Sequence, residues 1–280
     1  MSKIKIITDS TVDLSNEEIV TYDIEVVPLT IQINKQTYID RVDITPIEFI
    51  EKMKQADELP KSSQPSAGLF LEVYDRLGEA GYEVISIHMT GGMSGTVQSA
   101  TSAAQMSKTN VTVIDSMFIS RALAFQVIEA AKMAQQGKSG KEIIEQINKI
   151  RDQSQLFVVV DTLENLVKGG RIGKGAAMIG SLLNIKPIAS LEGGVYTPVA
   201  KVRSHSQVVK YLAKQFAADV QGKTIKGVGL VHVDGFELAT KLKKAIFDLT
   251  GYTDIDIIYT TPVIGTHTGV GAIGFMYYFE

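Results

Sequence analysis

Short runs of β-branched and aliphatic residues alternate with amphipathic segments along most of the chain. Each run has the length of a buried strand, and the predicted strands are Ile4–Thr8, Val84–His88, Val111–Asp115, Phe157–Asp161, Gly227–Val233 and Ile255–Tyr259. Between several of them apolar residues recur at helical spacing, most clearly at Ile143, Ile144, Ile147 and Ile150. Strands that alternate with helices predict an α/β fold with a mainly parallel sheet covered on both faces.

The second half of the chain has a different pattern. The runs Pro187–Leu191 and Val195–Val202 flank Glu192-Gly193-Gly194, which predicts a hairpin with a glycine turn. Further helices and strands follow, up to the apolar run Phe275–Phe279. We therefore predict two α/β lobes within one domain. Residues 1–160 hold the mainly parallel sheet, and residues 161–280 hold a mixed sheet that includes the hairpin.

The charge of the chain argues against several classes of partner. A formal net charge of −3 over 280 residues gives neither the basic excess of a nucleic-acid-binding protein nor a polybasic patch for anionic membranes. No apolar run approaches the ~20 residues of a membrane-spanning helix. The first residues enter a predicted strand and lack the pattern of a signal peptide. We expect a cytoplasmic protein with at most transient membrane contact and no nucleic-acid partner.

The residue types that carry much metal and redox chemistry are scarce. The chain has no cysteine, which excludes a thiolate nucleophile and a cysteine-type zinc site. Its four histidines do not stand at metal-ligand spacing, and no carboxylate cluster has an obvious ligand pattern. We expect neither a metal site nor a cofactor.

The clearest candidate site follows the predicted strand Val84–His88. A glycine-rich turn leads through Ser94-Gly95-Thr96 into a helical segment, and a helix start with free N–H groups, glycines and hydroxyls suits an anion. The turn matches no nucleotide-binding fingerprint, and a plain glycine turn with a capping serine fits these residues equally well.

Other polar clusters are individually ambiguous. The turn Ser62-Ser63-Gln64-Pro65-Ser66 and the segment Thr8-Asp9-Ser10-Thr11 could bind a ligand or cap helices. The basic, glycine-rich stretch 168–175 could wrap a phosphate or contact a protein partner. Ser94 with His267 as base would make a hydrolase, but the G-x-S-x-G elbow is missing.

Together these clusters resemble the DegV family, the fatty-acid-binding (FakB-type) subunits of bacterial fatty acid kinase. The resemblance covers essentially the whole chain and follows six motifs in order: Thr8–Thr11 with Asp13-Leu14, Ser63-Gln64-Pro65, Ser94-Gly95-Thr96 with Ser99, Lys168–Ile172, Lys186-Pro187-Ile188, and His267-Thr268-Gly269 with Gly271-Ala272. It implies a two-lobed protein that buries one long-chain fatty acid. It also implies that the carboxylate is presented to an ATP-dependent fatty acid kinase subunit, whose acyl-phosphate product feeds phospholipid synthesis.

The resemblance also implies roles for individual residues. The carboxylate-binding positions of the family fall on Ser62, Ser94, Arg203 and His267, and the full expected set is Ser62, Ser63, Ser94, Gly95, Thr96, Arg203, His267 and Thr268. In the basic loop, Lys168, Arg171 and Lys174 are candidates to dock the kinase or its phosphate. Two departures, Ser204-His205-Ser206 in place of further cations and Val270 in place of proline or glutamine, concern subtype and acyl preference.

These residue types suit the task that the resemblance implies. Burial of the tail contributes about 0.8 kcal/mol per CH2, while the carboxylate needs donors: hydroxyls, a helix start, and a charge from Arg203 or protonated His267. Part of the tail-binding wall is expected at Ala176–Ile179 and Leu182-Leu183. The alternatives are an enzyme acting on a small anionic or phosphorylated substrate through the Ser94 loop and His267, and a regulatory or structural protein with a vestigial pocket.

Overall fold

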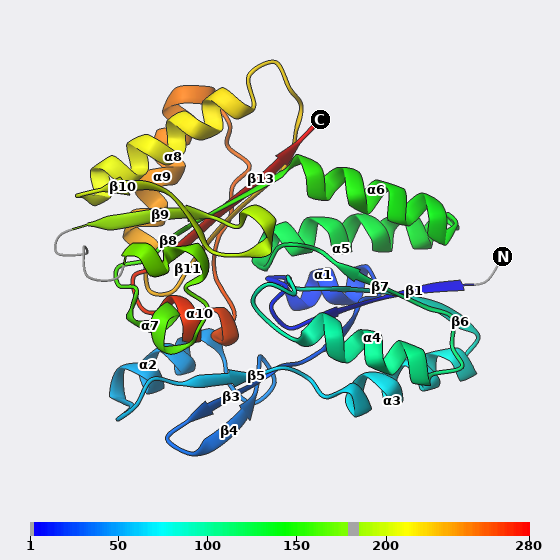
Figure 1. Cartoon of the computed structure of the whole chain (residues 1–280). Coiled ribbons are helices and arrows are strands. Elements are labelled where there is room, and N and C mark those ends of the chain that lie inside the picture. The colour runs from blue at the N-terminus through cyan, green and yellow to red at the C-terminus, as the bar shows by residue number, and fades with distance from the viewer. Residues whose placement is uncertain (1–2, 179–184) are drawn as a thin grey trace.

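The computed structural model describes residues 3–178 and 185–280 and contains two large sheets with helices between and around them (Figure 1). The first sheet has the strand order β2-β1-β6-β7, and all its pairings are parallel. Its strands are β1 (Lys3–Asp9), β2 (Glu25–Val27), β6 (Tyr82–His88) and β7 (Val111–Asp115). The predicted parallel sheet in the N-terminal half is confirmed.

Helices cover both faces of this sheet because its strands are apolar on both sides. On β1, Ile7 packs with residues of α3 (Ala67–Glu79) and α4 (Thr96–Met106), while Ile6 belongs to the larger core cluster that includes α5 (Ser120–Gln135). Successive strand side chains point to opposite faces, which explains this division. The short helix α1 (Asn16–Thr21) begins with a capping box of Ser15 and Glu18.

The second sheet is mixed, as predicted. Its order is β10-β9-β8-β13-β11-β12, and only β11 and β12 are parallel neighbours. The strands are β8 (Ser154–Val159), β9 (Lys186–Ser190), β10 (Thr197–Val202), β11 (Ile225–His232), β12 (Ile257–Tyr259) and β13 (Ile273–Phe279). The predicted hairpin is β9–β10, with the short 3-10 helix η2 (Glu192–Gly194) in its turn. Strand β8 pairs within this second sheet, although it comes before residue 160, where the first lobe was predicted to end.

A layer of helices separates the two sheets. Helices α5 and α6 (Gly140–Gln153) contact strands of the second sheet, and α5 also packs on β1 and β6. The opposite face of the second sheet is covered by α8 (His205–Asp219) and α9 (Phe236–Thr250), whose buried residues form a separate core cluster with Phe275 and Tyr277. None of the helices within the described residues is long and apolar enough to cross a membrane.

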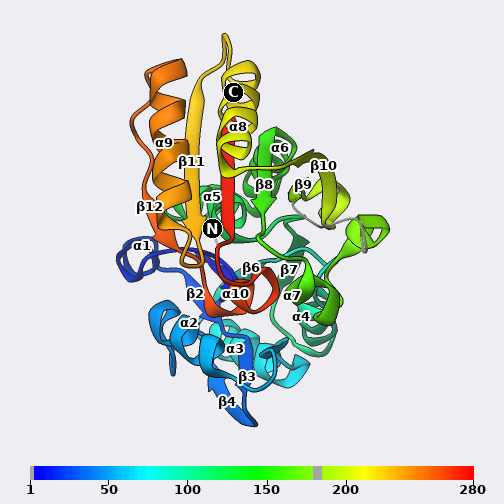
Figure 2. The same ribbon diagram turned by 90° about the vertical axis from the view of Figure 1, so that its left-hand side faces the viewer.

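A third, small sheet was not predicted. Strands β3 (Thr30–Ile33), β4 (Gln36–Ile39) and β5 (Lys61–Ser63) form an antiparallel unit, accompanied by α2 (Pro46–Gln55). This unit contacts α10 (Pro262–Thr268), which also contacts α7 (Glu164–Lys168). Figure 2 shows α10 between the second sheet above it and the small sheet with α2 below. Segments far apart in the sequence therefore meet around α10.

Candidate functional site

Two adjoining cavities lie in the core around α10. The larger one, which we call the proximal chamber, is narrow and has a cavity volume of about 50 Å³. The smaller one, the distal chamber, has a cavity volume of about 20 Å³. Both are lined mainly by aliphatic side chains, and they share the wall residues Ile119, Val158, Ile264 and Thr268. We call the two adjacent chambers together the apolar passage, and the shared residues that stand between them its constriction.

The expected tail-binding wall is only partly testable. Ala176 and Ala177 belong to the 3-10 helix η1 (Gly173–Met178), are exposed, and line neither chamber, so this part of the prediction is wrong. Residues Ile179, Leu182 and Leu183 lie outside the described residues. The observed wall comes instead from β8, α10, and the segments before α5 and after β6.

The proximal chamber has one polar end. The Ser62 Oγ and the His267 Nε2 are 2.7 Å apart, which joins β5 of the small sheet to α10. Ser62, Arg171 and His267 line the proximal chamber and also a surface hollow, the outer depression, which is bordered by the α2–β5 loop and by α7. These three residues therefore form the partition between the apolar passage and the protein surface.

Histidine 267 is neutral in this partition. Burial and the nearby Arg171 guanidinium lower the pKa of His267 to about 4. The cationic His267 considered from the sequence is therefore not the state present at neutral pH. A Cβ at Gly169 would lie 2.4 Å from the His267 Nδ1, so only glycine at position 169 leaves room for this ring.

Arg171, and not Arg203, is the arginine that lines the proximal chamber. The Arg171 Nε donates to the Met93 carbonyl at 2.9 Å and its Nη1 donates to the Gly169 carbonyl at 2.5 Å, so the guanidinium is held beside the loop that carries Ser94. Arg203 follows β10, the edge strand of the second sheet, where its side chain is exposed and lines neither chamber. The structure does not bring Arg203 to the polar end.

The Ser94-Gly95-Thr96 turn lies beside the polar end. Ser94 lines the proximal chamber, and its Oγ is 2.8 Å from the Thr96 Oγ1 and accepts the Thr96 N–H at 3.3 Å. Thr96 is fully buried and starts α4. A Cβ at Gly95 would lie 2.3 Å from the Gln64 Oε1, which shows how closely the turn approaches the Gln-Pro segment.

The remaining predicted residues have different positions. Ser63 neighbours Ser62 on β5, and because strand side chains alternate, Ser63 is exposed and lines neither chamber. Thr268 lines both chambers, but its hydroxyl donates to the Ile264 carbonyl at 3.0 Å. Lys168 borders the outer depression and pairs with Glu164 at 2.7 Å, whereas Lys174 is exposed and does not border it.

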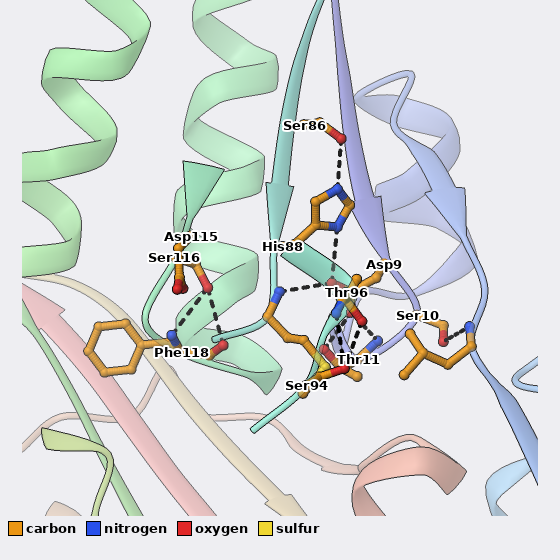
Figure 3. Close-up of polar contacts among 12 residues, drawn as sticks. Asp9, Ser10, Thr11, Ser86, His88, Ser94, Thr96, Asp115, Ser116 and Phe118 are labelled. Atoms are coloured by element: carbon orange, nitrogen blue, oxygen red, sulfur yellow. Dashed lines mark hydrogen bonds and ion pairs between the residues drawn. The ribbon is translucent and has the colours of Figure 1, made fainter. Parts of the chain in front are cut away.

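Behind the proximal chamber lies a buried hydrogen-bond network centred on Asp9 (Figure 3). The Asp9 carboxylate accepts the Thr11 N–H at 3.0 Å and the Met89 N–H at 2.8 Å, and both of these residues line the chamber. On its other side it meets the His88 Nδ1 at 3.1 Å, and the His88 Nε2 is 2.7 Å from the Ser86 Oγ. Burial alone would raise the pKa of Asp9, but the bonds from His88, Thr11 and Met89 together hold it below its usual value. Asp9 therefore fixes the chamber wall and does not itself line the chamber.

A second buried carboxylate, Asp13, joins the two halves of the molecule. It accepts the hydroxyl of Ser120 at the start of α5, the Thr260 hydroxyl at 2.8 Å and the Thr261 N–H at 2.9 Å. Thr261 is the residue before α10, which carries His267. No role was predicted for Asp13, although it follows a predicted strand, where such contacts commonly form.

The fold and the cavity define a class: an α/β protein with an apolar passage in its core that has one polar end. A family model described as "Uncharacterised protein, DegV family" matches residues 3–280, so the chain belongs to the DegV family. A DegV domain-containing protein of Listeria monocytogenes is 46% identical over 279 residues, which cover 99% of each chain. The resemblance noted in the sequence is confirmed at the level of the family.

Solved structures of family members have the same fold. One, titled as fatty acid binding of a DegV family protein from Thermus thermophilus, matches with a TM-score of 0.92, 31% identity and full coverage of both chains. Another, of DegV, a fatty acid binding protein from Bacillus subtilis, matches with a TM-score of 0.91, 30% identity and full coverage of both chains.

Proposed function

We propose that this protein binds a single long-chain fatty acid, with the tail in the proximal and distal chambers and the carboxylate at the polar end. The observation that carries the proposal is the partition of Ser62, Arg171 and His267, which closes an apolar passage with hydrogen-bond donors and one cation. The fatty acids bound by the relatives from Thermus thermophilus and Bacillus subtilis support the same class of ligand.

The apolar passage suits the tail. Burial of a sixteen-carbon chain contributes on the order of 10 kcal/mol before the cost of ordering it, at about 0.8 kcal/mol per CH2. The flexible side chains of Met89 and Met93 in the proximal wall let the passage adapt to different chains.

The polar end suits the carboxylate. Arg171 provides a charge-assisted donor, and the hydroxyl of Ser94 adds a second donor. When the His267 Nε2 carries the proton and donates to the Ser62 Oγ, the Ser62 hydroxyl is free to donate to the ligand. Neutral His267 thus acts through its tautomer, and Arg171 carries the charge that offsets the buried anion.

We further propose that the carboxylate is presented through the outer depression to an ATP-dependent fatty acid kinase subunit in the cytoplasm. Because Ser62, Arg171 and His267 border both spaces, a carboxylate bound to them lies one side-chain layer from the surface. Lys168 at the rim is then a docking contact for the kinase. The acyl-phosphate product would enter phospholipid synthesis.

A hydrolase built on Ser94 and His267 is less well supported. Such an enzyme needs the serine hydroxyl bonded to the histidine. His267 is instead 2.7 Å from Ser62, and the Ser94 Oγ bonds within its own turn to Thr96. A histidine with a pKa of about 4 is also a weak base at neutral pH.

Native and denaturing mass spectrometry of the purified protein tests the fatty-acid proposal. We expect a stoichiometric fatty acid in the wild type and its loss in Arg171→Ala and Ser94→Ala, while the matched controls Arg203→Ala and Ser63→Ala keep it. A wild type that is purified without a ligand and that also fails to bind added palmitate and oleate would contradict the proposal.

A kinase assay tests the second proposal. With ATP and a fatty acid kinase added, Lys168→Glu should slow acyl-phosphate formation without loss of the bound acid.

A further inference from the structure

Tyrosine 196 has a buried hydroxyl without a partner in the described part of the chain. Its side chain is 1% exposed and lines the proximal chamber. Its Oη makes no hydrogen bond, whereas the hydroxyls of Tyr74 and Tyr277, which are buried elsewhere, donate to Ser86 and Asp219. Burial raises the pKa of Tyr196, so the hydroxyl keeps its proton and remains a donor.

The basic, glycine-rich stretch is built closely around this tyrosine. The Lys174 N–H donates to the Tyr196 carbonyl at 2.9 Å. A Cβ at Gly173 would lie 2.7 Å from that carbonyl oxygen, and a Cβ at Gly175 would lie 2.9 Å from the Tyr196 Cε1. Glycine at both positions therefore lets the chain pack against backbone and ring. This contact accounts for two glycines that the proposed carboxylate site leaves unexplained.

The packing explains the ring but not the hydroxyl. Phenylalanine would fill the same space, and it would avoid a polar atom that loses water when an apolar chain fills the chamber. A ligand in the chamber can supply the partner that the described residues do not. Tyr196 borders the proximal chamber but neither the outer depression nor the distal chamber, so we expect the partner group on the part of the ligand that lies in the proximal chamber.

We propose that Tyr196 binds an oxygen substituent on the acyl chain, so that the ligand class includes fatty acids with a hydroxyl or keto group in the half of the chain nearer the carboxylate. This inference rests on the proposed fatty-acid function and adds a second polar contact to it. The tyrosine hydroxyl donates to the substituent oxygen, and a ligand hydroxyl can also donate to the tyrosine.

Competition binding with palmitate and a series of hydroxypalmitates that differ in hydroxyl position tests this assignment. We expect one isomer near the carboxylate end to lose about tenfold in affinity in Tyr196→Phe, the effect of one buried hydrogen bond. Palmitate should bind Tyr196→Phe as well as wild type or better. Tyr277→Phe is the matched control, because its hydroxyl bonds Asp219 away from both chambers, and it should leave the discrimination unchanged.

The outcomes separate this inference from the proposed function. An equal loss for palmitate and for every hydroxypalmitate would make Tyr196 a carboxylate contact and overturn the inference. Equal affinities of wild type and Tyr196→Phe for every acid would also overturn it. If wild type binds none of the acids, the proposed fatty-acid function fails, and with it the premise of the inference.

Discussion

The two ends of the passage are built in different ways. The polar end is held by hydrogen bonds between segments far apart in the sequence, such as Ser62 with His267 and Arg171 with Met93. The distal chamber is lined mainly by aliphatic side chains from β8, β11, α10 and β13. Hydrogen bonds fix atoms to a narrow geometry, whereas packed aliphatic groups tolerate changes that keep their volume. We therefore expect fatty-acid binding to be sensitive to the loss of single polar atoms at the polar end. At the distal end we expect it to depend on the volume of the side chains.

The largest effect on binding is expected at Arg171. Removal of its guanidinium leaves the buried carboxylate without a cation, so Arg171→Ala should weaken fatty-acid binding by about 3 kcal/mol, roughly 100-fold. Displacement of a fluorescent fatty acid gives the affinity directly. Arg203→Ala serves as the control, since its side chain is exposed outside the passage. Equal losses in the two variants would remove the special role of Arg171.

The next largest effect is on the stability of the fold, which is expected to change with pH through the buried carboxyl group of Asp40. Burial raises the pKa of Asp40 to about 7, although the Ser10 hydroxyl, 2.6 Å away, opposes this shift. The folded form binds the proton more tightly than the unfolded chain, so this group makes the protein more stable as pH falls from 8 to 5, by about 2 kcal/mol. Urea unfolding at both pH values should show this gain in wild type and its loss in Asp40→Asn. A gain of the same size in Asp40→Asn would assign it to another group.

A smaller effect is expected from the paired serines of β5. Ser62→Ala removes a hydroxyl at the polar end and should weaken fatty-acid binding by about 1.5 kcal/mol. Ser63→Ala makes the same change on the exposed face of the same strand and should leave affinity unchanged. Titration calorimetry of both variants compares them directly. A loss in Ser63→Ala would mean that disturbance of β5, and not the Ser62 contact, lowers affinity.

The smallest change is expected at the distal end. Met276 is buried and borders the distal chamber, so Met276→Ala enlarges it. Each added CH2 of the ligand should then gain up to about 0.8 kcal/mol, which shifts the preference toward longer chains. Relative affinities for C14, C16, C18 and C20 acids measure this shift. Met53→Ala, on α2 outside both chambers, should leave the order of these affinities as in wild type.

The sequence predicted most of the large sheets but not the small one. Strongly apolar runs such as Val84–His88 and Val111–Asp115 are unambiguous signals, and both lie in strands. Strand β5 is Lys61-Ser62-Ser63, with no apolar residue, and it is a strand because it pairs with β3. Such a strand depends on tertiary context, and a pattern search has no local signal for it.

For the candidate site, the motifs located Ser62, Ser94 and His267, which the structure brings to one chamber. They pointed to Arg203, whereas Arg171 is the arginine that lines this chamber. Arg203 follows β10, an edge strand of the second sheet, and this strand order cannot be read from the motifs. The neutral state of His267 could not be predicted either, since it follows from burial beside Arg171.

The Asp13 contacts have a consequence for the order of folding. Asp13 lies in the first turn after β1, while Thr260 and Thr261, to which it bonds, follow it by 247 and 248 residues. During synthesis the first sheet can assemble long before these partners leave the ribosome. The start of α10, and with it the His267 side of the partition, can be fixed only when nearly the whole chain is present. Nascent or truncated chains should therefore be well folded around β1 while they still lack a closed polar end.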